Sequence, residues 1–299
     1  MKHFLSIESQ TAEHLMALLE SAIQFKANRG KASAPLLHGQ TWALLFSKPS
    51  TRTRVSFEVG VHELGGNAIF LSQGDIQLGR GEPIIDTARV LGRMVQGAVI
   101  RTFAQSDVDQ FAEYGQIPTI NALTDEEHPC QILADLFTIL EKRGNLDDLK
   151  VCFIGDGNNN VAHSWIWAAE RLGFELRIAA PGNYRPASSL LQKLTNRKIV
   201  VTDDPLAGAD QADVLYTDVW VSMGLEEESA RRLLELDRFR INESLVARAA
   251  AGALVLHCLP AYRGKEITAE TFEKHARTIF DQAENRLHVQ KAILSDVRK

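Results

Sequence analysis

The chain alternates short apolar runs with segments of helical periodicity, and the whole pattern restarts near residue 150. Apolar runs of this length, bounded by Gly, Pro or polar residues, are typical of buried strands. The expected strands are residues 42–46, 68–71, 98–101, 119–122, 151–154, 175–179, 198–202, 214–217 and 254–257. Their alternation with helices indicates parallel sheets that are covered on both faces. We therefore predict an α/β fold of two doubly wound parallel-sheet domains, with the active site in the cleft between them.

The domain boundary follows from the point at which this pattern restarts. The helices are expected at residues 11–26, 53–64, 84–94, 108–114, 131–142, 161–172 and 187–194, with a final helix after residue 283. A chain of 299 residues is long enough for two domains of ordinary size. We place the first domain at residues 1–143 and the second at 144–283, and we expect a last helix, about 284–299, to pack back on the first.

Composition narrows the function classes. The net charge of -5 gives no general attraction to nucleic acid or to an anionic membrane. No apolar run approaches the roughly 20 residues of a membrane span, and we expect a cytoplasmic protein. The three cysteines, Cys130, Cys152 and Cys258, lack the paired spacing of a disulfide framework or a zinc site, so we expect no metal.

The pentad Ser50-Thr51-Arg52-Thr53-Arg54 follows the first apolar run and opens a helix. Unpaired backbone N–H groups and the helix dipole favour an anion at such a place, and arginine offers paired donors to phosphate oxygens. A plain helix cap followed by solvated arginines is the alternative interpretation. The pentad lacks the glycine spacing of a nucleotide P-loop, which favours a small phosphate compound over ATP.

Residues 46–58, which include this pentad, resemble the carbamoyl phosphate signature of the aspartate and ornithine carbamoyltransferases. The box His128-Pro129-Cys130-Gln131 and the triplet Glu284-Asn285-Arg286 match the same family in the same order. The resemblance implies that carbamoyl phosphate is bound by Ser50, Thr51, Arg52, Thr53, Arg101, His128, Gln131 and Arg286, and by Gln77 from a neighbouring subunit. Within this set it assigns Thr53, Arg101 and His128 to the carbonyl oxygen, where negative charge develops as an amine attacks.

Three segments of the second half resemble the ornithine branch of the family. They are residues 155–160, 218–224 and 257–260, each directly after an expected strand. The resemblance implies that ornithine is bound by Asn159, Asp218, Ser222, Met223, Cys258 and Leu259. It places Cys258 and Asp218 beside the reacting δ-amine, so the catalytic residues are expected to be Arg101, His128, Asp218 and Cys258. Direct attack by the amine needs no acyl-enzyme, and Cys258 is therefore assigned an orienting role.

The resemblance implies a carbamoyltransferase that converts carbamoyl phosphate and L-ornithine into L-citrulline and phosphate, in arginine biosynthesis. It implies no cofactor, and it implies a homotrimer or a multiple of trimers whose sites are completed by a neighbour's loop.

Alternatives remain open on the residues alone. Pro83 and Tyr262 depart from residues that are common in the ornithine branch, which keeps N-acylornithine or putrescine as rival acceptors. The segment 155–160 could also be a dinucleotide loop, although its third glycine position is not glycine. A protein that binds these ligands without catalysis is the third alternative.

Overall fold

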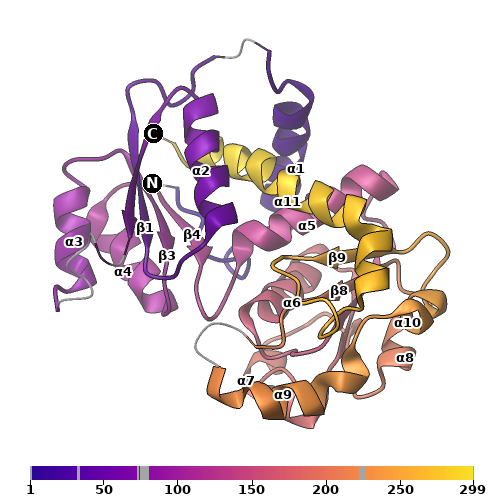
Figure 1. Cartoon of the computed structure of the whole chain (residues 1–299). Helices are drawn as coiled ribbons and strands as arrows, with labels where there is room; N and C mark the ends of the chain where they lie inside the picture. Colours follow the sequence, from indigo (N-terminus) through magenta and orange to yellow (C-terminus); the bar gives the residue numbers. More distant parts are fainter. Residues whose placement is uncertain (1, 32–33, 73, 75–80, 222–225, 299) are drawn as a thin grey trace. The chain divides into compact units, whose positions relative to one another are not determined.

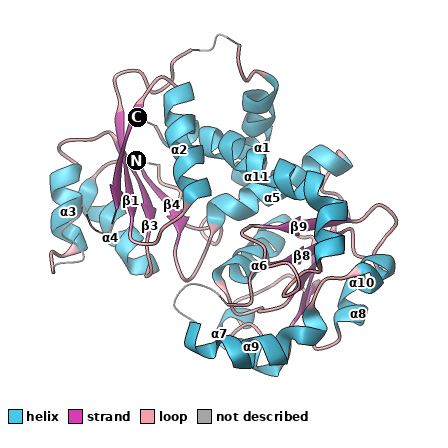
Figure 2. Ribbon diagram, in the orientation of Figure 1, coloured by secondary structure: helices cyan, strands magenta, loops and turns pink. Residues whose placement is uncertain are grey.

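Two parallel sheets, each enclosed by helices, form the computed structural model of the chain (Figures 1 and 2). The structure describes residues 2–31, 34–72, 74, 81–221 and 226–298. The chain divides into two compact units, Met1–Phe137 with Glu284–Lys299 and Thr138–Ala283, called unit 1 and unit 2 below. We had placed the division at residues 143 and 144.

Unit 1 is built on a four-stranded sheet of order β2-β1-β3-β4. Its strands are β1 (Thr41–Phe46), β2 (Asn67–Ser72), β3 (Gly97–Arg101) and β4 (Thr119–Leu123). Its helices are α1 (Ala12–Ala27), α2 (Thr51–Glu63), α3 (Ile84–Leu91), α4 (Gln105–Gly115) and the start of α5 (Pro129–Arg143). Apolar side chains of β1 and β3 pack with α3 and α4 on one face of the sheet, and α2 covers the other face (Figure 1).

Unit 2 contains a five-stranded sheet of order β7-β6-β5-β8-β9. Its strands are β5 (Lys150–Ile154), β6 (Glu175–Ala179), β7 (Ile199–Thr202), β8 (Val214–Thr217) and β9 (Leu254–His257). On one face, α8 (Pro205–Ala209), α10 (Glu243–Arg248) and the first turns of α11 (Ala269–Val297) close an apolar core. On the other face, Trp165 of α6 (Asn160–Leu172) packs edge-on against Tyr216 of β8, with ring centroids 5.3 Å apart.

The predicted strands are confirmed, because each expected run coincides with a strand of the structure to within one residue or so at either end. The helices are less well predicted. The short helices α8, α10 and α9 (Ser229–Leu236) were not expected, and α7 (Ser188–Leu191) is half as long as predicted. The final helix begins earlier than predicted, at Ala269, and continues to Val297.

Both ends of the chain belong to unit 1. The ammonium group of Lys2 lies 2.9 Å from a carboxylate oxygen of Asp296, and Asp296 also contacts His14 of α1 at 2.9 Å. Among the described residues, no helix combines the length and the apolar character that crossing a membrane requires.

Candidate functional site

The strand order places polar loops side by side in each sheet. In unit 1 the order reverses between β1 and β3, and in unit 2 it reverses between β5 and β8. Connections leave such a pair of strands in opposite directions, so a crevice opens at their carboxyl ends, where α/β proteins bind ligands. The pentad follows β1 and Arg101 is the last residue of β3, while the loops of Asn159 and Asp218 follow β5 and β8.

Helix α2 begins at the first of these points. Ser50 is its N-cap, with the hydroxyl accepting a hydrogen bond from the backbone N–H of Thr53 at 3.3 Å. Thr51 and Arg52 are exposed in the first turn. A cavity of about 530 Å³ is lined by Ser50, Thr51 and Arg54 together with residues of β1 and β2. The start of α2 therefore offers N–H groups and hydroxyls to a ligand in solvent contact.

Five polar side chains of unit 1 form a buried group that we call the arginine cluster: Thr53, Arg101, His128, Gln131 and Arg286. None of the five is more than 6% exposed. The guanidinium of Arg286 donates to Oε1 of Gln131 at 2.6 Å and to the hydroxyl of Thr53 at 3.3 Å. Thr53 and Arg286 are 233 residues apart in the chain, so folding brings the pentad and α11 together.

The cluster is a region of positive potential. Burial lowers the pKa of His128 well below its ordinary value of 6.5, and the nearby guanidinium groups of Arg286 and Arg101 lower it further. The imidazole is therefore neutral at neutral pH, and it can donate one hydrogen bond without adding a third positive charge. Two buried guanidinium groups beside a neutral imidazole suit a compact anion that has several acceptor oxygens.

Gln131 is oriented by a carboxylate. Its Nε2 group donates to Oδ1 of Asp135, one turn further along α5, at 2.8 Å. The amide oxygen is thereby turned toward Arg286. Asp135 is completely buried and was not predicted as a site residue, although it follows the His-Pro-Cys-Gln box at helical spacing.

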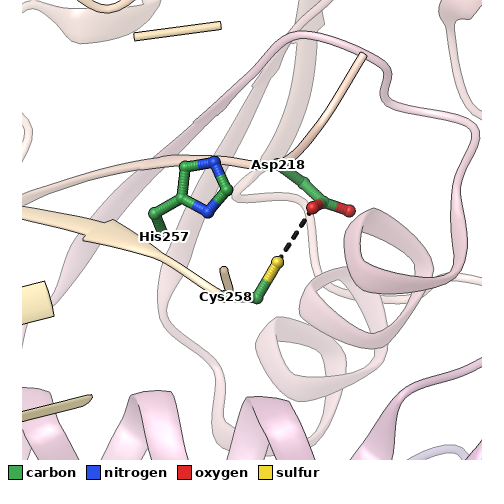
Figure 3. Close-up of side chains that lie close together, drawn as sticks. All are labelled: Asp218, His257 and Cys258. Carbon is green, nitrogen blue, oxygen red and sulfur yellow. Dashed lines mark hydrogen bonds between the residues drawn. The ribbon is translucent and has the colours of Figure 1, made fainter. Parts of the chain in front are cut away.

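Unit 2 brings together a second group, the aspartate cluster, which consists of Asn159, Asp218, His257 and Cys258. Thr217 of β8 and His257 of β9 are paired neighbours in the sheet, so Asp218 and Cys258 emerge side by side. The thiol of Cys258 donates to Oδ1 of Asp218 at 2.9 Å (Figure 3). The amide of Asn159 lies 3.4 Å from the other carboxylate oxygen, while its own oxygen caps α6.

Asp218 is a buried carboxyl group whose pKa is shifted upward. Burial raises its pKa above the ordinary value of 3.8, although His257, the thiol of Cys258 and the backbone N–H of Val219 act in the opposite direction. A buried carboxylate is costly without a cationic partner, and such a partner would lower the pKa again. The cluster is therefore suited to an ammonium group.

His257 holds the backbone that follows β9. Its Nδ1 accepts the N–H of Leu259 at 2.9 Å, which leaves the proton on Nε2, 3.1 Å from Glu266. Leu259 has a left-handed backbone, with φ at 60°, a conformation that leucine rarely adopts unless its surroundings impose it. We infer that His257 and Glu266, both buried, stabilise this conformation.

Donor atoms of Asp218, His257 and Cys258 lie within 4.8 Å of one another, a spacing that could suit a metal ion. Both ring nitrogens of His257 already contact protein groups, and the thiol of Cys258 donates to Asp218. The ring nitrogens of His257 are thus engaged with Leu259 and Glu266, and Cys258 is engaged with Asp218. The expectation of a site without metal stays a prediction.

The structure gathers most of the predicted site residues into these two clusters and the start of α2. Gln77, Ser222 and Met223 lie outside the described residues. Sequence reasoning missed Lys48, Glu266 and Arg232, which are buried charged groups. Lys48 contacts Asp125 and lies 4.3 Å from the ring centre of Phe103. Its position beside the pentad was the available signal, whereas Arg232 follows Arg231 in a polar stretch that resembles a solvated helix face.

Two family models match nearly the whole chain. The carbamoyl-P binding domain of aspartate/ornithine carbamoyltransferase matches residues 2–141, and the Asp/Orn binding domain matches residues 147–297.

Individual relatives agree with the family models. The ornithine carbamoyltransferase of Akkermansia muciniphila is 54% identical, over 99% of this chain and 97% of the relative. That of Carboxydothermus hydrogenoformans is 49% identical, over 98% and 96%. Among solved structures, the anabolic ornithine carbamoyltransferase of Campylobacter jejuni superposes with a TM-score of 0.94 at 43% identity, covering 99% of each chain. The Pyrococcus furiosus ornithine carbamoyltransferase gives 0.93 at 43% identity, with 99% and 97% covered.

The lowered pKa of His128 has a consequence for stability. In the folded protein the imidazole of His128 stays neutral, whereas in the unfolded chain it takes up a proton near pH 6.5. The contribution of His128 to the free energy of unfolding is therefore fully present above pH 6.5 and is lost as the pH drops below that value. One such group contributes up to about 1.4 kcal/mol per pH unit. Urea unfolding between pH 5 and 8 should therefore show that the free energy of unfolding falls less steeply with decreasing pH in His128→Asn than in wild type. His62→Asn, at an exposed position of unit 1, is the control, and equal slopes for wild type and His128→Asn would contradict the assignment.

Proposed function

The chain belongs to the aspartate/ornithine carbamoyltransferase family, and from this premise we propose that it transfers the carbamoyl group of carbamoyl phosphate to the δ-amine of L-ornithine. It is a carbamoyltransferase, and the products of the proposed reaction are L-citrulline and phosphate. One observation carries the proposal. Unit 1 contains two buried guanidinium groups that suit an anion, and unit 2 contains a buried carboxyl group that suits an ammonium ion.

In unit 1, we assign the phosphate of carbamoyl phosphate to the start of α2, where Ser50, Thr51, Arg52 and Thr53 present hydroxyl, N–H and guanidinium donors. Arg286, in contact with Thr53, adds a buried positive charge. These groups bind the phosphate in the ground state and stabilise it as it leaves with an additional negative charge.

The carbonyl oxygen of the carbamoyl group is assigned to Thr53, Arg101 and His128. When the amine attacks the carbonyl carbon, the π electrons move to this oxygen and a tetrahedral intermediate forms. When the intermediate collapses, the carbonyl re-forms, the bond from carbon to the phosphate oxygen breaks, and the departing phosphate accepts a proton from the attacking nitrogen. Donors already in place stabilise the oxyanion without reorganisation, and each is worth about 10²–10³ in rate. Gln131 turns its amide oxygen into the cluster, where it can accept the N–H of the carbamoyl amide.

For ornithine, we assign Asp218 and Cys258 to the amine region, with Leu259 beside them and Asn159 against the same carboxyl group. Ser222 and Met223 are proposed to hold the amino acid by resemblance to the family alone. Binding an ammonium group beside Asp218 favours the charged carboxylate, so ornithine binding should release a proton when the carboxyl is initially protonated.

We also propose that the enzyme works in the biosynthetic direction and in the cytoplasm. The Campylobacter jejuni relative, with a TM-score of 0.94, is an anabolic ornithine carbamoyltransferase, which supports a role in arginine biosynthesis. The composition, with 45% hydrophobic and 24% charged residues, is ordinary for a globular protein of the cytoplasm, where we place the reaction.

Acceptor preference tests the proposed reaction. We expect citrulline formation from ornithine to exceed carbamoylation of N-acetylornithine, putrescine or aspartate by at least about 10² in kcat/KM, because a site built to bind polar groups rejects acceptors that lack them. Arg52→Ala should lower kcat/KM for carbamoyl phosphate by about 10² or more. Arg93→Ala, an exposed arginine of unit 1, is the control. Faster carbamoylation of another acceptor, or full activity in Arg52→Ala, would refute the assignment.

The attacking amine must lose its proton. A free δ-amine resembles lysine, with a pKa near ~10.4, and is almost wholly protonated at neutral pH. We expect desolvation near Cys258 to lower this pKa by more than the neighbouring carboxylate of Asp218 raises it, so kcat should rise through an ionisation between about pH 6 and 9. The Cys258→Ala variant distinguishes the amine from the thiol, because the ionisation should persist in it. A flat profile over this range would contradict the proposal.

We further propose a homotrimer, or a multiple of trimers, in which Gln77 reaches a neighbour's carbamoyl phosphate. Sedimentation should give about three times the chain mass of 33.2 kDa, or a multiple of that. Refolding Gln77→Ala together with Arg52→Ala should restore activity, since mixed assemblies contain sites with both wild-type residues. The double variant, refolded alone, should stay inactive. Full activity in a monomer would exclude the role of Gln77.

A further inference from the structure

Arg232 is a buried arginine that none of the assigned roles uses. It lies in α9, and its side chain is 7% exposed, whereas the side chain of its neighbour Arg231 is 62% exposed. A buried guanidinium is costly unless several acceptors surround it. The local fold provides them, because Arg232 contacts groups from three separate segments of unit 2.

Two of these contacts come from the loops that carry the aspartate cluster. The Nη2 group of Arg232 donates to the carboxylate of Asp156, which lies three residues before Asn159. The Nε group donates to the backbone oxygen of Trp220, two residues after Asp218. The third contact is with Tyr184, whose ring centre lies 4.8 Å from the guanidinium carbon.

The two loops are also packed directly against each other. Gly155 has a φ of 130°, and a Cβ atom there would lie 3.2 Å from the indole nitrogen of Trp220. A side chain on Gly157 would lie 2.5 Å from a methyl group of Ile178 in β6. In addition, the carboxylate of Asp156 accepts the backbone N–H of Asn158 at 3.0 Å. The loop at 155–159 thus has little room to move while Asp156 stays bound to Arg232.

We propose that Arg232 is a positioning residue for the acceptor amino acid: it joins the loop of Asn159 to the loop of Asp218 and so sets the distance between these two side chains. This inference rests on the proposed function and deepens it. Arg232 acts through Asp156 and the Trp220 carbonyl and is not assigned a contact with substrate. Displacing a binding group by about 1 Å can cost a factor of up to 10² in rate, so a positioning role has a kinetic signature.

The test compares steady-state kinetics of Arg232→Met and Arg231→Met in the full-length enzyme. Both variants replace an arginine of α9 that contacts Glu228, but only Arg232 reaches the two loops. We expect Arg232→Met to raise the KM for ornithine at least about tenfold and to leave the KM for carbamoyl phosphate within about twofold. Arg231→Met should leave both values within about twofold.

The variant Asp156→Asn tests the same contact by changing the partner of Arg232, and the KM for ornithine is again measured. It keeps hydrogen-bonding atoms in place and removes the charge, so it should raise the KM for ornithine less than Arg232→Met does. Combined with Arg232→Met, it should add little further, because both changes break one link. If Arg232→Met does not fold, Arg232→Lys and Asp156→Asn carry the test.

The outcomes separate this inference from the function. If the variants lower the melting temperature and leave the KM for ornithine unchanged, Arg232 is only structural and the proposal is overturned. An equal rise in KM for both substrates would also overturn it. If wild type does not form citrulline from ornithine, the proposed function itself fails.

Discussion

When two neighbouring parallel strands connect to opposite sides of a sheet, the loops at their carboxyl ends meet at one place. In unit 1 this place lies between β1 and β3, and in unit 2 between β5 and β8. Arg101 ends β3, while Asp218 and Cys258 directly follow paired strands. The side chains to which we assign the chemistry are therefore positioned by backbone hydrogen bonds of the sheet, and short loops need to add only the final orientation.

Burial has opposite effects on the pKa values in the two clusters: it lowers the pKa of His128 and raises the pKa of Asp218. In the arginine cluster, burial and two guanidinium groups lower the pKa of His128, so the imidazole stays neutral and can donate a hydrogen bond to the anion that we propose binds there. In the aspartate cluster, burial disfavours the charge on Asp218, and the ammonium group that we propose as its partner would favour that charge. Under the proposed function, ligand binding offsets the cost of burying charge in both clusters and couples occupancy of the site to its protonation state.

The sequence predicted the strands well and the arrangement within each cluster poorly. Strands are fixed by local apolar runs, and the residues that follow them could be assigned by their resemblance to a family. The hydrogen bonds between Arg286 and Gln131, and between Arg232 and Asp156, join residues that are 155 and 76 positions apart, and no local pattern encodes such pairings. Arg231 and Arg232 look alike in the sequence, yet the tertiary fold exposes one and buries the other.

Unit 1 is assembled from both ends of the chain, with Met1–Phe137 completed by Glu284–Lys299. On the ribosome, the whole of residues 138–283 is synthesised before residues 284–299 emerge to join the first segment of unit 1. Until then Lys26 lacks Asn285, Glu63 lacks Lys291, and the pentad lacks Arg286. Contacts of such long sequence separation form late because closing the loop costs chain entropy. The contact between the pentad and Arg286 consequently forms only after the whole of unit 2 has been synthesised, and a chain that stops before residue 284 lacks this guanidinium beside the proposed anion site.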